Sequence, residues 1–252
     1  MLACLAAAFF LLPIAGLLAR THWSTFFGDL TSSGALSAIK LSIECSLGST
    51  LLSLALGVPL AWVLARSTIP GRPLLRAIVL LPMVLPPVVG GVALLFAFGR
   101  TNGLVGPFLY HAFGLQLTYS PFGVVMAETF VAMPFLIITV EGGLRSIDTR
   151  LEDAAATLGA GALRRFWKVT LPLLAPALYA GTALAWARAL GEFGATITFA
   201  GDIAGRTETT PLAVYLLLES DPAAAIALSV MLLAVSLIVL VALRDRWFGL
   251  RR

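Results

Sequence analysis

Six long apolar stretches with few or no charges divide this chain, and they constrain its fold more than any other feature. They lie near residues 2–19, 45–65, 77–98, 121–140, 172–199 and 223–243. About 20 helical residues cross the hydrocarbon core of a bilayer, where lipid offers no hydrogen-bond partner to an open backbone. None of the stretches alternates as a barrel strand does. The pattern therefore predicts an all-α polytopic membrane protein with six transmembrane helices, in one domain over residues 1–252.

The composition excludes the other broad classes. Of the 252 residues, 59% are hydrophobic and 12% are charged, against about a quarter charged in a soluble domain. This leaves too few polar side chains to cover a soluble globule and too many apolar ones for a disordered chain. Cys4 and Cys45 fall in or beside apolar stretches and are expected to be small buried hydrophobic residues. Neither they nor His22 and His111 have the spacing of metal ligands, so no metal site is expected.

The basic residues predict the orientation. With six helices the connecting segments alternate sides, which places twelve Lys and Arg residues on one side and four on the other. The richer set is Arg66, Arg72, Arg76, Arg145, Arg150, Arg164, Arg165, Lys168, Arg244, Arg246, Arg251 and Arg252. Because cytoplasmic loops carry the excess of basic residues, both termini are predicted to be cytoplasmic. The net charge of +4 then reflects topology and implies no nucleic-acid partner. We also expect no C-terminal regulatory domain after the sixth stretch.

The third stretch is interrupted by helix-breaking residues. Pro82, Pro86, Pro87, Gly90 and Gly91 fall within ten residues, so the helix is expected to be kinked or locally unwound. One interpretation is a packing kink. The other is a segment lining a water-filled path, because irregular backbone at membrane depth must face protein or a cavity. Pro86 and Pro87 are the candidate path residues under the second interpretation.

The chain lacks an energy source of its own. A phosphate-binding loop ends in Gly-Lys-Ser/Thr, but Lys40 and Lys168 are the only lysines and neither follows a glycine. No nucleophile elbow or His-Glu-x-x-His helix is present either, so the chain is not expected to be an enzyme or to bind a cofactor. An ion-driven secondary transporter is an alternative. It predicts inverted repeats and a relay of carboxylates, and the sequence has neither.

The segment of about 142–171 carries most of the interpretable motifs and is expected to form one or two short helices on the cytoplasmic face. Thr149-Arg150-Leu151-Glu152 has the form of a capping box, and the helix it opens is expected to stop at Gly159. Asp153-Ala154-Ala155, then Gly159, then Val169-Thr170-Leu171-Pro172 resemble the "EAA" signature of ABC-importer permeases. Asp stands where Glu is usual, and Val where Ile is usual.

This resemblance implies a type I ABC-importer permease with a helix that docks into a cleft of a separate cytoplasmic ATPase. Leu171-Pro172 would then begin the fifth transmembrane helix. The ATPase would use the ATP and Mg²⁺, and a homodimer of the chain would work with two ATPase subunits and an extracytoplasmic binding protein in a bacterial-type cell membrane. The residues implied in coupling are Glu152, Asp153, Ala154, Ala155, Leu158, Gly159, Leu171 and Pro172.

The fifth stretch places two opposite charges inside the membrane. Arg188 and Glu192 are four residues apart, so they lie on one helix face and can pair. Intramembrane charges are costly and usually face a cavity or each other, which indicates a functional role. The alternative is an ion pair that only stabilises the bundle.

Residues 188–201 and 205–215 resemble the corresponding region of molybdate permeases, to which sulfate and tungstate permeases are close relatives. The resemblance implies uptake of molybdate, with sulfate, thiosulfate or tungstate as alternatives. Gly191, Gly194, Thr196 and Thr198 offer amides and hydroxyls to a tetrahedral oxyanion, whereas a carboxylate would repel it. We therefore expect the paired charges to brace a gate. The candidate path or gate residues are Pro86, Pro87, Arg188, Gly191, Glu192, Phe193, Gly194, Thr196 and Thr198.

Overall fold

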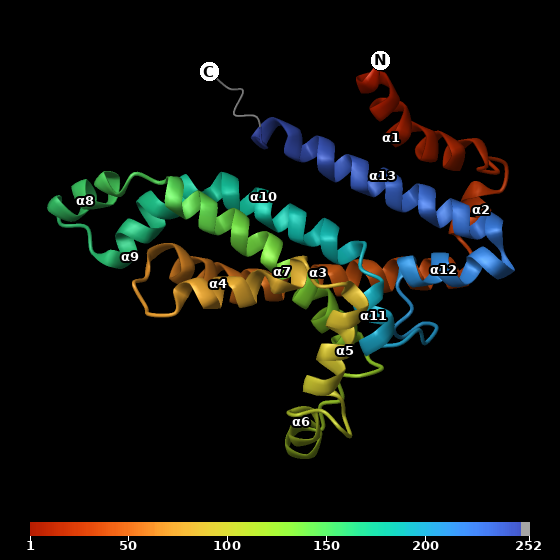
Figure 1. Cartoon of the computed structure of the whole chain (residues 1–252), viewed down its shortest axis with the longest axis horizontal. Coiled ribbons are helices and arrows are strands. Elements are labelled where there is room, and N and C mark those ends of the chain that lie inside the picture. The colour runs from red at the N-terminus through yellow and green to blue at the C-terminus, as the bar shows by residue number, and fades with distance from the viewer. Residues whose placement is uncertain (248–252) are drawn as a thin grey trace.

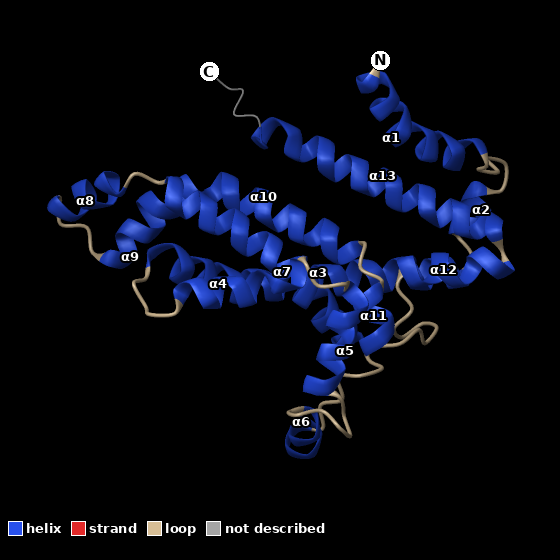
Figure 2. Cartoon of the chain, in the orientation of Figure 1, coloured by secondary structure: helices blue, strands red, loops and turns tan. Residues whose placement is uncertain are grey.

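The computed structural model describes residues 1–247, with side chains for residues 1–242, and over this part it consists of helices and loops (Figure 2). The helices are α1 (Leu2–Ala19), α2 (Phe26–Leu30), α3 (Ser33–Arg66), α4 (Arg72–Leu80), α5 (Pro87–Phe98), α6 (Gly106–Phe113), α7 (Pro121–Ser146), α8 (Thr149–Thr157), α9 (Ala162–Arg165), α10 (Leu171–Leu190), α11 (Gly194–Phe199), α12 (Thr210–Ser220) and α13 (Pro222–Trp247). A 3₁₀ turn at Leu81–Met83 follows α4, and a π-helical turn at Phe166–Thr170 precedes α10. The all-α expectation is confirmed for the described residues. Arg251 and Arg252, and the side chains of Arg244 and Arg246, lie outside them.

The expected spans are present, but the second begins earlier than expected and the fifth is broken. Five helical stretches of the described chain are long and apolar enough to cross a membrane, and a sixth is added if the bent pair Arg72–Met83 and Pro87–Phe98 counts as one span. The second span begins at Ser33 rather than near residue 45. The third is broken by a bend of 116° at Pro86 and Pro87, so the predicted interruption is confirmed. The proline rings remove backbone donors there, which stops one helix and starts the next.

The fifth stretch is not one continuous helix, as was expected for residues 172–199. Helix α10 ends at Leu190, and α11 begins only at Gly194. Gly191 follows the last helical residue, and Phe193 has a non-helical backbone (φ −128°). Helix α12 follows at Thr210–Ser220, in the segment that connects the fifth and sixth apolar stretches. The break allows α11 to leave the direction of α10 and pack against α5.

Helices α3, α7 and α10 form the centre of the molecule and lie side by side (Figure 1). Small residues bring them together: a Cβ atom at Gly57 of α3 or Gly181 of α10 would lie 3.2 or 3.1 Å from the Leu136 side chain of α7. Such close packing is what associates helices in lipid, where apolar burial gives no advantage. The core that results includes Ala61, Leu64, Leu136, Ile137, Val140, Leu144, Leu174 and Ala185.

A row of serines along α3 adds polar contacts to this packing. Ser42, Ser46, Ser49 and Ser53 lie on one face of the helix and are all buried. The backbone N–H of Thr210 donates to Ser42 Oγ at 2.7 Å, and Trp186 Nε1 donates to Ser46 Oγ at 3.1 Å. The row therefore joins α12 and α10 to α3.

Helix α1 lies apart from this centre (Figure 1), and none of its residues is buried. Its apolar side chains are suited to lipid contact. The expectation of buried cysteines is confirmed for Cys45 and is wrong for Cys4, which is exposed on α1.

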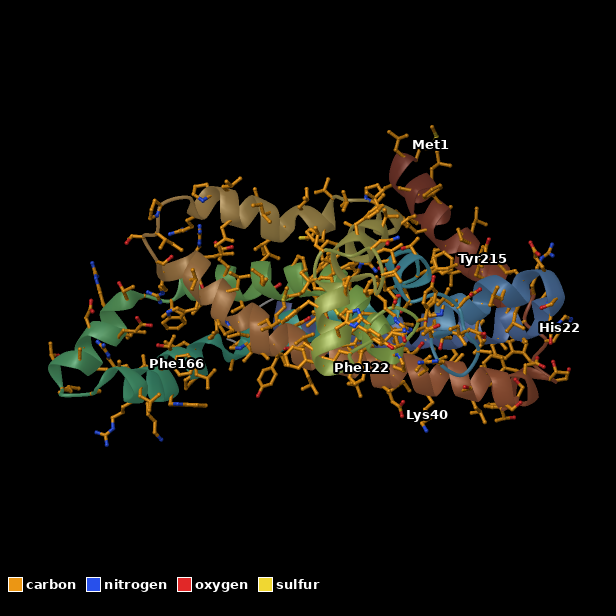
Figure 3. The ribbon with its side chains drawn as sticks, turned by 90° about the horizontal axis from the view of Figure 1, so that it is seen from below. Met1, His22, Lys40, Phe122, Phe166 and Tyr215 are labelled. Atoms are coloured by element: carbon orange, nitrogen blue, oxygen red, sulfur yellow. The ribbon has the colours of Figure 1, made fainter. Side chains whose placement is uncertain are left out.

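The bundle has two distinct ends. Figure 3 shows Phe166 near one end, with α8 and α9, and His22 near the other. A Cβ at Gly48 would touch Val125 and one at Gly57 would touch Met133, so α3 and α7 run in the same direction. Arg66, which ends α3, and Arg145, in the last turn of α7, therefore lie at the end that carries α8.

Candidate functional site

The short helix α8 is held against the bundle by one carboxylate. Glu152 Oε1 accepts a hydrogen bond from Thr170 Oγ1 at 2.8 Å and pairs with Arg66 Nη2 at 3.3 Å. These contacts tie α8 to the end of α3 and to the turn that leads into α10. The expected capping box is wrong: Asp148, not Thr149, caps the helix and accepts from the Arg150 backbone N–H at 3.0 Å. An aspartate at that position is a strong cap, and it leaves Glu152 for a tertiary contact.

Helix α8 stops at Gly159 as expected. Gly159 has a φ of +81°, its N–H donates to the Ala156 carbonyl, and the Ala160 N–H donates to the Ala155 carbonyl. This pattern is the Schellman motif, which favours glycine because a Cβ is strained at positive φ. A Cβ at Gly159 would meet no atom within 4 Å, so the glycine faces open space.

Exposed residues of α8 and of the segment that follows it make up what we call the α8 surface: Asp153, Ala154, Leu158, Leu163 and Trp167. Leu158 is 88% exposed, Leu163 is 73% exposed and Trp167 is 58% exposed. A cluster of large apolar side chains left open in this way is typical of a protein interaction site. Ala155 is partly buried. Leu171 and Pro172 are the first residues of α10, but the continuous helix that is long and apolar enough to cross the membrane begins earlier, at Ala162.

The break between α10 and α11 is organised by Glu192. Arg188 Nη2 lies 2.6 Å from Glu192 Oε2, so the expected ion pair is confirmed. Glu192 Oε1 accepts from the backbone N–H of Ala195 at 2.8 Å, in the first turn of α11. The carboxylate is only 1% exposed. It thus joins the end of one helix to the start of the next, where negative charge is favourable.

The helices that follow the two breaks, α5 and α11, are packed almost backbone to backbone. A Cβ at Gly91 of α5 would lie 1.6 Å from Thr198 Oγ1 and 2.8 Å from the Ala195 carbonyl oxygen. A Cβ at Gly194 of α11 would lie 2.9 Å from Pro87 Cβ. The structure therefore brings together Pro87, Gly194 and Thr198, three of the predicted path residues. Pro86 directly precedes this contact, at the start of α5.

The remaining predicted path residues differ in their surroundings. Thr196 is fully buried, and its hydroxyl has no hydrogen-bond partner among the residues described. Thr198 Oγ1 donates to the Gly194 carbonyl at 2.8 Å. The Phe193 ring packs on Tyr215 of α12 with a centroid distance of 5.2 Å, and Gly191 is exposed.

Sequence reasoning missed two features of this region. Gly91 is a helix breaker by its type, whereas in the structure it is the point of close contact with α11. Glu128 of α7 is 1% exposed, its Oε2 atom has no partner in the described part of the chain, and it interacts electrostatically with Glu192. A carboxylate inside a membrane span is the signal that points to such a residue. Two buried carboxylates make this interior unfavourable for an anion, which favours a bracing role for Glu192 and Arg188.

Comparison with known proteins places the sequence among transport components. Residues 57–249 match the family described as binding-protein-dependent transport system inner membrane component. The molybdenum transport system permease protein ModB of Mycobacterium tuberculosis is 47% identical over 240 residues, which cover 94% of this chain and 89% of that protein. ModB of Escherichia coli is 41% identical over 84% of this chain and 92% of that protein. The sulfate transport system permease protein CysT of Salmonella typhimurium is 39% identical over 91% of this chain and 84% of that protein.

Solved structures show the same fold. A bacterial ABC transporter involved in the import of the acidic polysaccharide alginate matches with a TM-score of 0.78 at 19% identity, covering 100% of this chain and 94% of that chain. The MetNI methionine ABC transporter in an inward facing conformation matches with a TM-score of 0.62 at 18% identity. The match covers 86% of this chain and 96% of that chain.

Proposed function

Because the chain belongs to the family of binding-protein-dependent transport system inner membrane components, we propose that it is the permease subunit of an ATP-driven importer that takes up molybdate. The observation that carries the substrate is the 47% identity to a molybdenum permease along 94% of the chain, against 39% to a sulfate permease. Sulfate, thiosulfate and tungstate are the alternative substrates. The chain itself is a membrane component and not an ATPase.

The first prediction tests this function directly. The chain, purified from native membranes in mild detergent, is expected to carry with it an ATPase that has a Gly-x-x-x-x-Gly-Lys-Ser/Thr loop. Uptake of labelled molybdate by the reconstituted complex is expected to require ATP and the binding protein. An excess of unlabelled molybdate is expected to compete more strongly than the same excess of sulfate. Uptake by the chain alone without ATP would instead establish a secondary transporter, and stronger competition by sulfate would move the assignment to that anion.

We propose that the end of the bundle carrying α8 faces the cytoplasm, with both termini on that side. The support is the excess of twelve basic residues over four, since cytoplasmic segments carry the positive charge. We further propose that the chain forms one permease domain and pairs with a second copy, which gives twelve spans around a central path. Two ATPases and an extracytoplasmic binding protein complete the complex.

We propose that α8 is the coupling element and that its exposed surface enters a cleft of the ATPase. Small side chains at Ala154 and Ala155 allow close approach, while Leu158 supplies an apolar contact that is open in the isolated chain. Glu152 links any movement of α8 to α3 and α10, because it contacts Arg66 and Thr170. ATP binding would draw the ATPases together and move α8, and hydrolysis would reset it.

Gly159→Trp is expected to abolish both ATPase recovery and ATP-dependent uptake. The indole would project from the α8 surface next to Leu158, and a side chain at a φ of +81° strains the helix stop. The matched control is Gly34→Trp, since Gly34 is also exposed with nothing within 4 Å of its Cβ position but lies at the start of α3, at the end of the bundle away from α8. Pull-down of the ATPase and uptake measure the effect. Full activity of Gly159→Trp would rule out α8 as the coupling element.

We propose that the α5–α11 contact lies at the gate of the path, with Pro86, Pro87, Gly191, Phe193, Gly194, Thr196 and Thr198 along it. Thr196 supports this because it lies in α11 at this contact and its buried hydroxyl has no hydrogen-bond partner among the described residues. Two helices that each follow a flexible break can separate without breaking their own hydrogen-bond ladders. Arg188 and Glu192 hold the α10–α11 turn in place during that movement.

A further inference from the structure

Three arginines line one depression at the end of the bundle that carries α8. The depression has a volume of about 510 Å³. Its lining residues are Arg72, Pro73, Arg76, Ala77, Leu80 and Arg145. Helix α4 supplies all of them except Arg145, which lies in the last turn of α7. We call this depression the arginine pocket.

The arginine pocket holds more positive than negative charge. Glu141 of α7 is 1% exposed and pairs with Arg76 Nε at 3.2 Å and with Arg145 Nη2 at 2.6 Å. Arg72 has no carboxylate partner in the described chain, and its Nη1 atom donates to the Ser67 carbonyl at 2.9 Å. One carboxylate therefore faces three guanidinium groups. Glu152, also at this end, is paired with Arg66 and does not line the pocket.

The guanidinium groups are held in position yet remain accessible. The Arg76 and Arg145 side chains are 41% and 42% exposed, while Arg76 Nε and Arg145 Nη2 contact Glu141, which leaves the other guanidinium nitrogens without an ion-pair partner in the described chain. An arginine presents five N–H donors in a planar fork that matches the oxygens of a phosphate group. A buried carboxylate that fixes two such forks beside a third prepares a site for an oxyanion with at least one negative charge.

The rest of the lining distinguishes the source of that oxyanion. Pro73, Ala77 and Leu80 form apolar walls beside the arginines. On the opposite face of the same segment, Leu74, Ile78 and Leu81 are 67%, 58% and 54% exposed, which suits lipid contact. A phospholipid has a phosphate for the arginines and an apolar body for the walls, whereas a free phosphate or molybdate ion uses only the first. Basic pockets between helices at the cytoplasmic side are typical sites for anionic headgroups.

We propose that the arginine pocket binds the phosphate headgroup of an anionic phospholipid of the cytoplasmic leaflet. The inference rests on the proposed orientation and on no assumption about the transported substrate. A bound lipid would neutralise the excess charge and fix α4 against the end of α7. It would thereby stabilise the segment that leads into the break before α5.

The test is native mass spectrometry of the delipidated full-length chain titrated with phosphatidylglycerol. Arg72→Gln is the main variant because it leaves both partners of Glu141 in place. Removing one charge is expected to weaken phosphatidylglycerol binding about fivefold, and Arg72→Glu about 25-fold. Arg164→Gln is the matched control, an exposed arginine at the same end but outside the pocket, and it is expected to bind as the unmodified chain does. Phosphatidylcholine is expected to bind no more weakly to Arg72→Gln than to the unmodified chain.

Two results would overturn the proposal. One is equal phosphatidylglycerol binding by Arg72→Gln and Arg164→Gln, with melting temperatures in detergent confirming that both are folded. The other is binding of inorganic phosphate or molybdate to the delipidated chain that is lost in Arg72→Gln, because the pocket would then take a free oxyanion. Molybdate uptake by the unmodified chain is measured separately. If Arg72→Gln binds phosphatidylglycerol as well as Arg164→Gln does while the unmodified chain still takes up molybdate, this inference fails and the proposed function stands.

Discussion

Arg188→Ala is expected to produce the most damaging single change, lowering the melting temperature in detergent and reducing molybdate uptake to background. The substitution leaves the Glu192 carboxylate, 1% exposed, with no cation to pair with. It also leaves that charge near Glu128, which is equally buried. Breaking a buried ion pair on one side costs about 3–5 kcal/mol. Arg206→Ala is the matched control, an exposed arginine in the following loop.

A double variant separates a bracing role from a direct role in transport. Arg188→Met/Glu192→Gln removes both charges but keeps an oxygen that can accept from the Ala195 N–H. Removal of both partners of a buried pair is often neutral. If the pair only braces the α10–α11 turn, this variant is expected to recover the melting temperature and most of the uptake. A stable double variant without uptake would contradict the bracing role and assign the charges to the transport path.

Gly91→Val is expected to reduce uptake at least about tenfold while the chain still inserts and assembles. Its Cβ would lie 1.6 Å from Thr198 Oγ1 and 2.8 Å from the Ala195 carbonyl. The threonine hydroxyl can rotate away, but the carbonyl belongs to the α11 backbone and cannot. Overpacking of this kind costs about 1–3 kcal/mol, and here it forces α5 and α11 apart at the proposed gate. Uptake in vesicles and ATPase activity of the complex measure the effect.

The control for this variant is Gly142→Val on α7, where a Cβ would meet nothing within 4 Å. It adds the same side chain to a membrane helix without separating two helices. ATP hydrolysis that continues in Gly91→Val without uptake would indicate a gate that no longer closes. Normal uptake by Gly91→Val would mean that the α5–α11 contact is not part of the gate.

The helical class and the spans were predictable because lipid admits few backbone solutions. A run such as 121–140 has to be helical in a bilayer, whatever its neighbours are. The stop of α8 at Gly159 was equally local, since only the residue itself decides whether a positive φ is tolerated. The Arg188–Glu192 pair also followed from spacing alone, because four residues bring two side chains onto one face of a helix.

The capping of α8 and the course of the fifth stretch were not predictable in this way. Thr149 and Glu152 have the local pattern of a capping box. Glu152 instead pairs with Arg66 and accepts a hydrogen bond from Thr170, and both of these residues are distant in sequence. The stretch 172–199 is apolar enough for one helix, yet it breaks after Leu190 so that α11 can pack on α5 through Gly91 and Gly194.

Sequence by itself therefore determined which segments are apolar enough to cross a membrane, where the basic residues accumulate, and which short motif we propose as the coupling element. The tertiary structure alone decided that α5 and α11 meet through Gly91 and Gly194 and that Arg72, Arg76 and Arg145 share one pocket. The physical reason is the separation along the sequence over which each interaction acts. Hydropathy and backbone preference act within a few residues, whereas close packing of glycines and pairing of buried charges join residues far apart in the chain. Gly91 and Thr198 carry no signal of their contact until the helices are packed together.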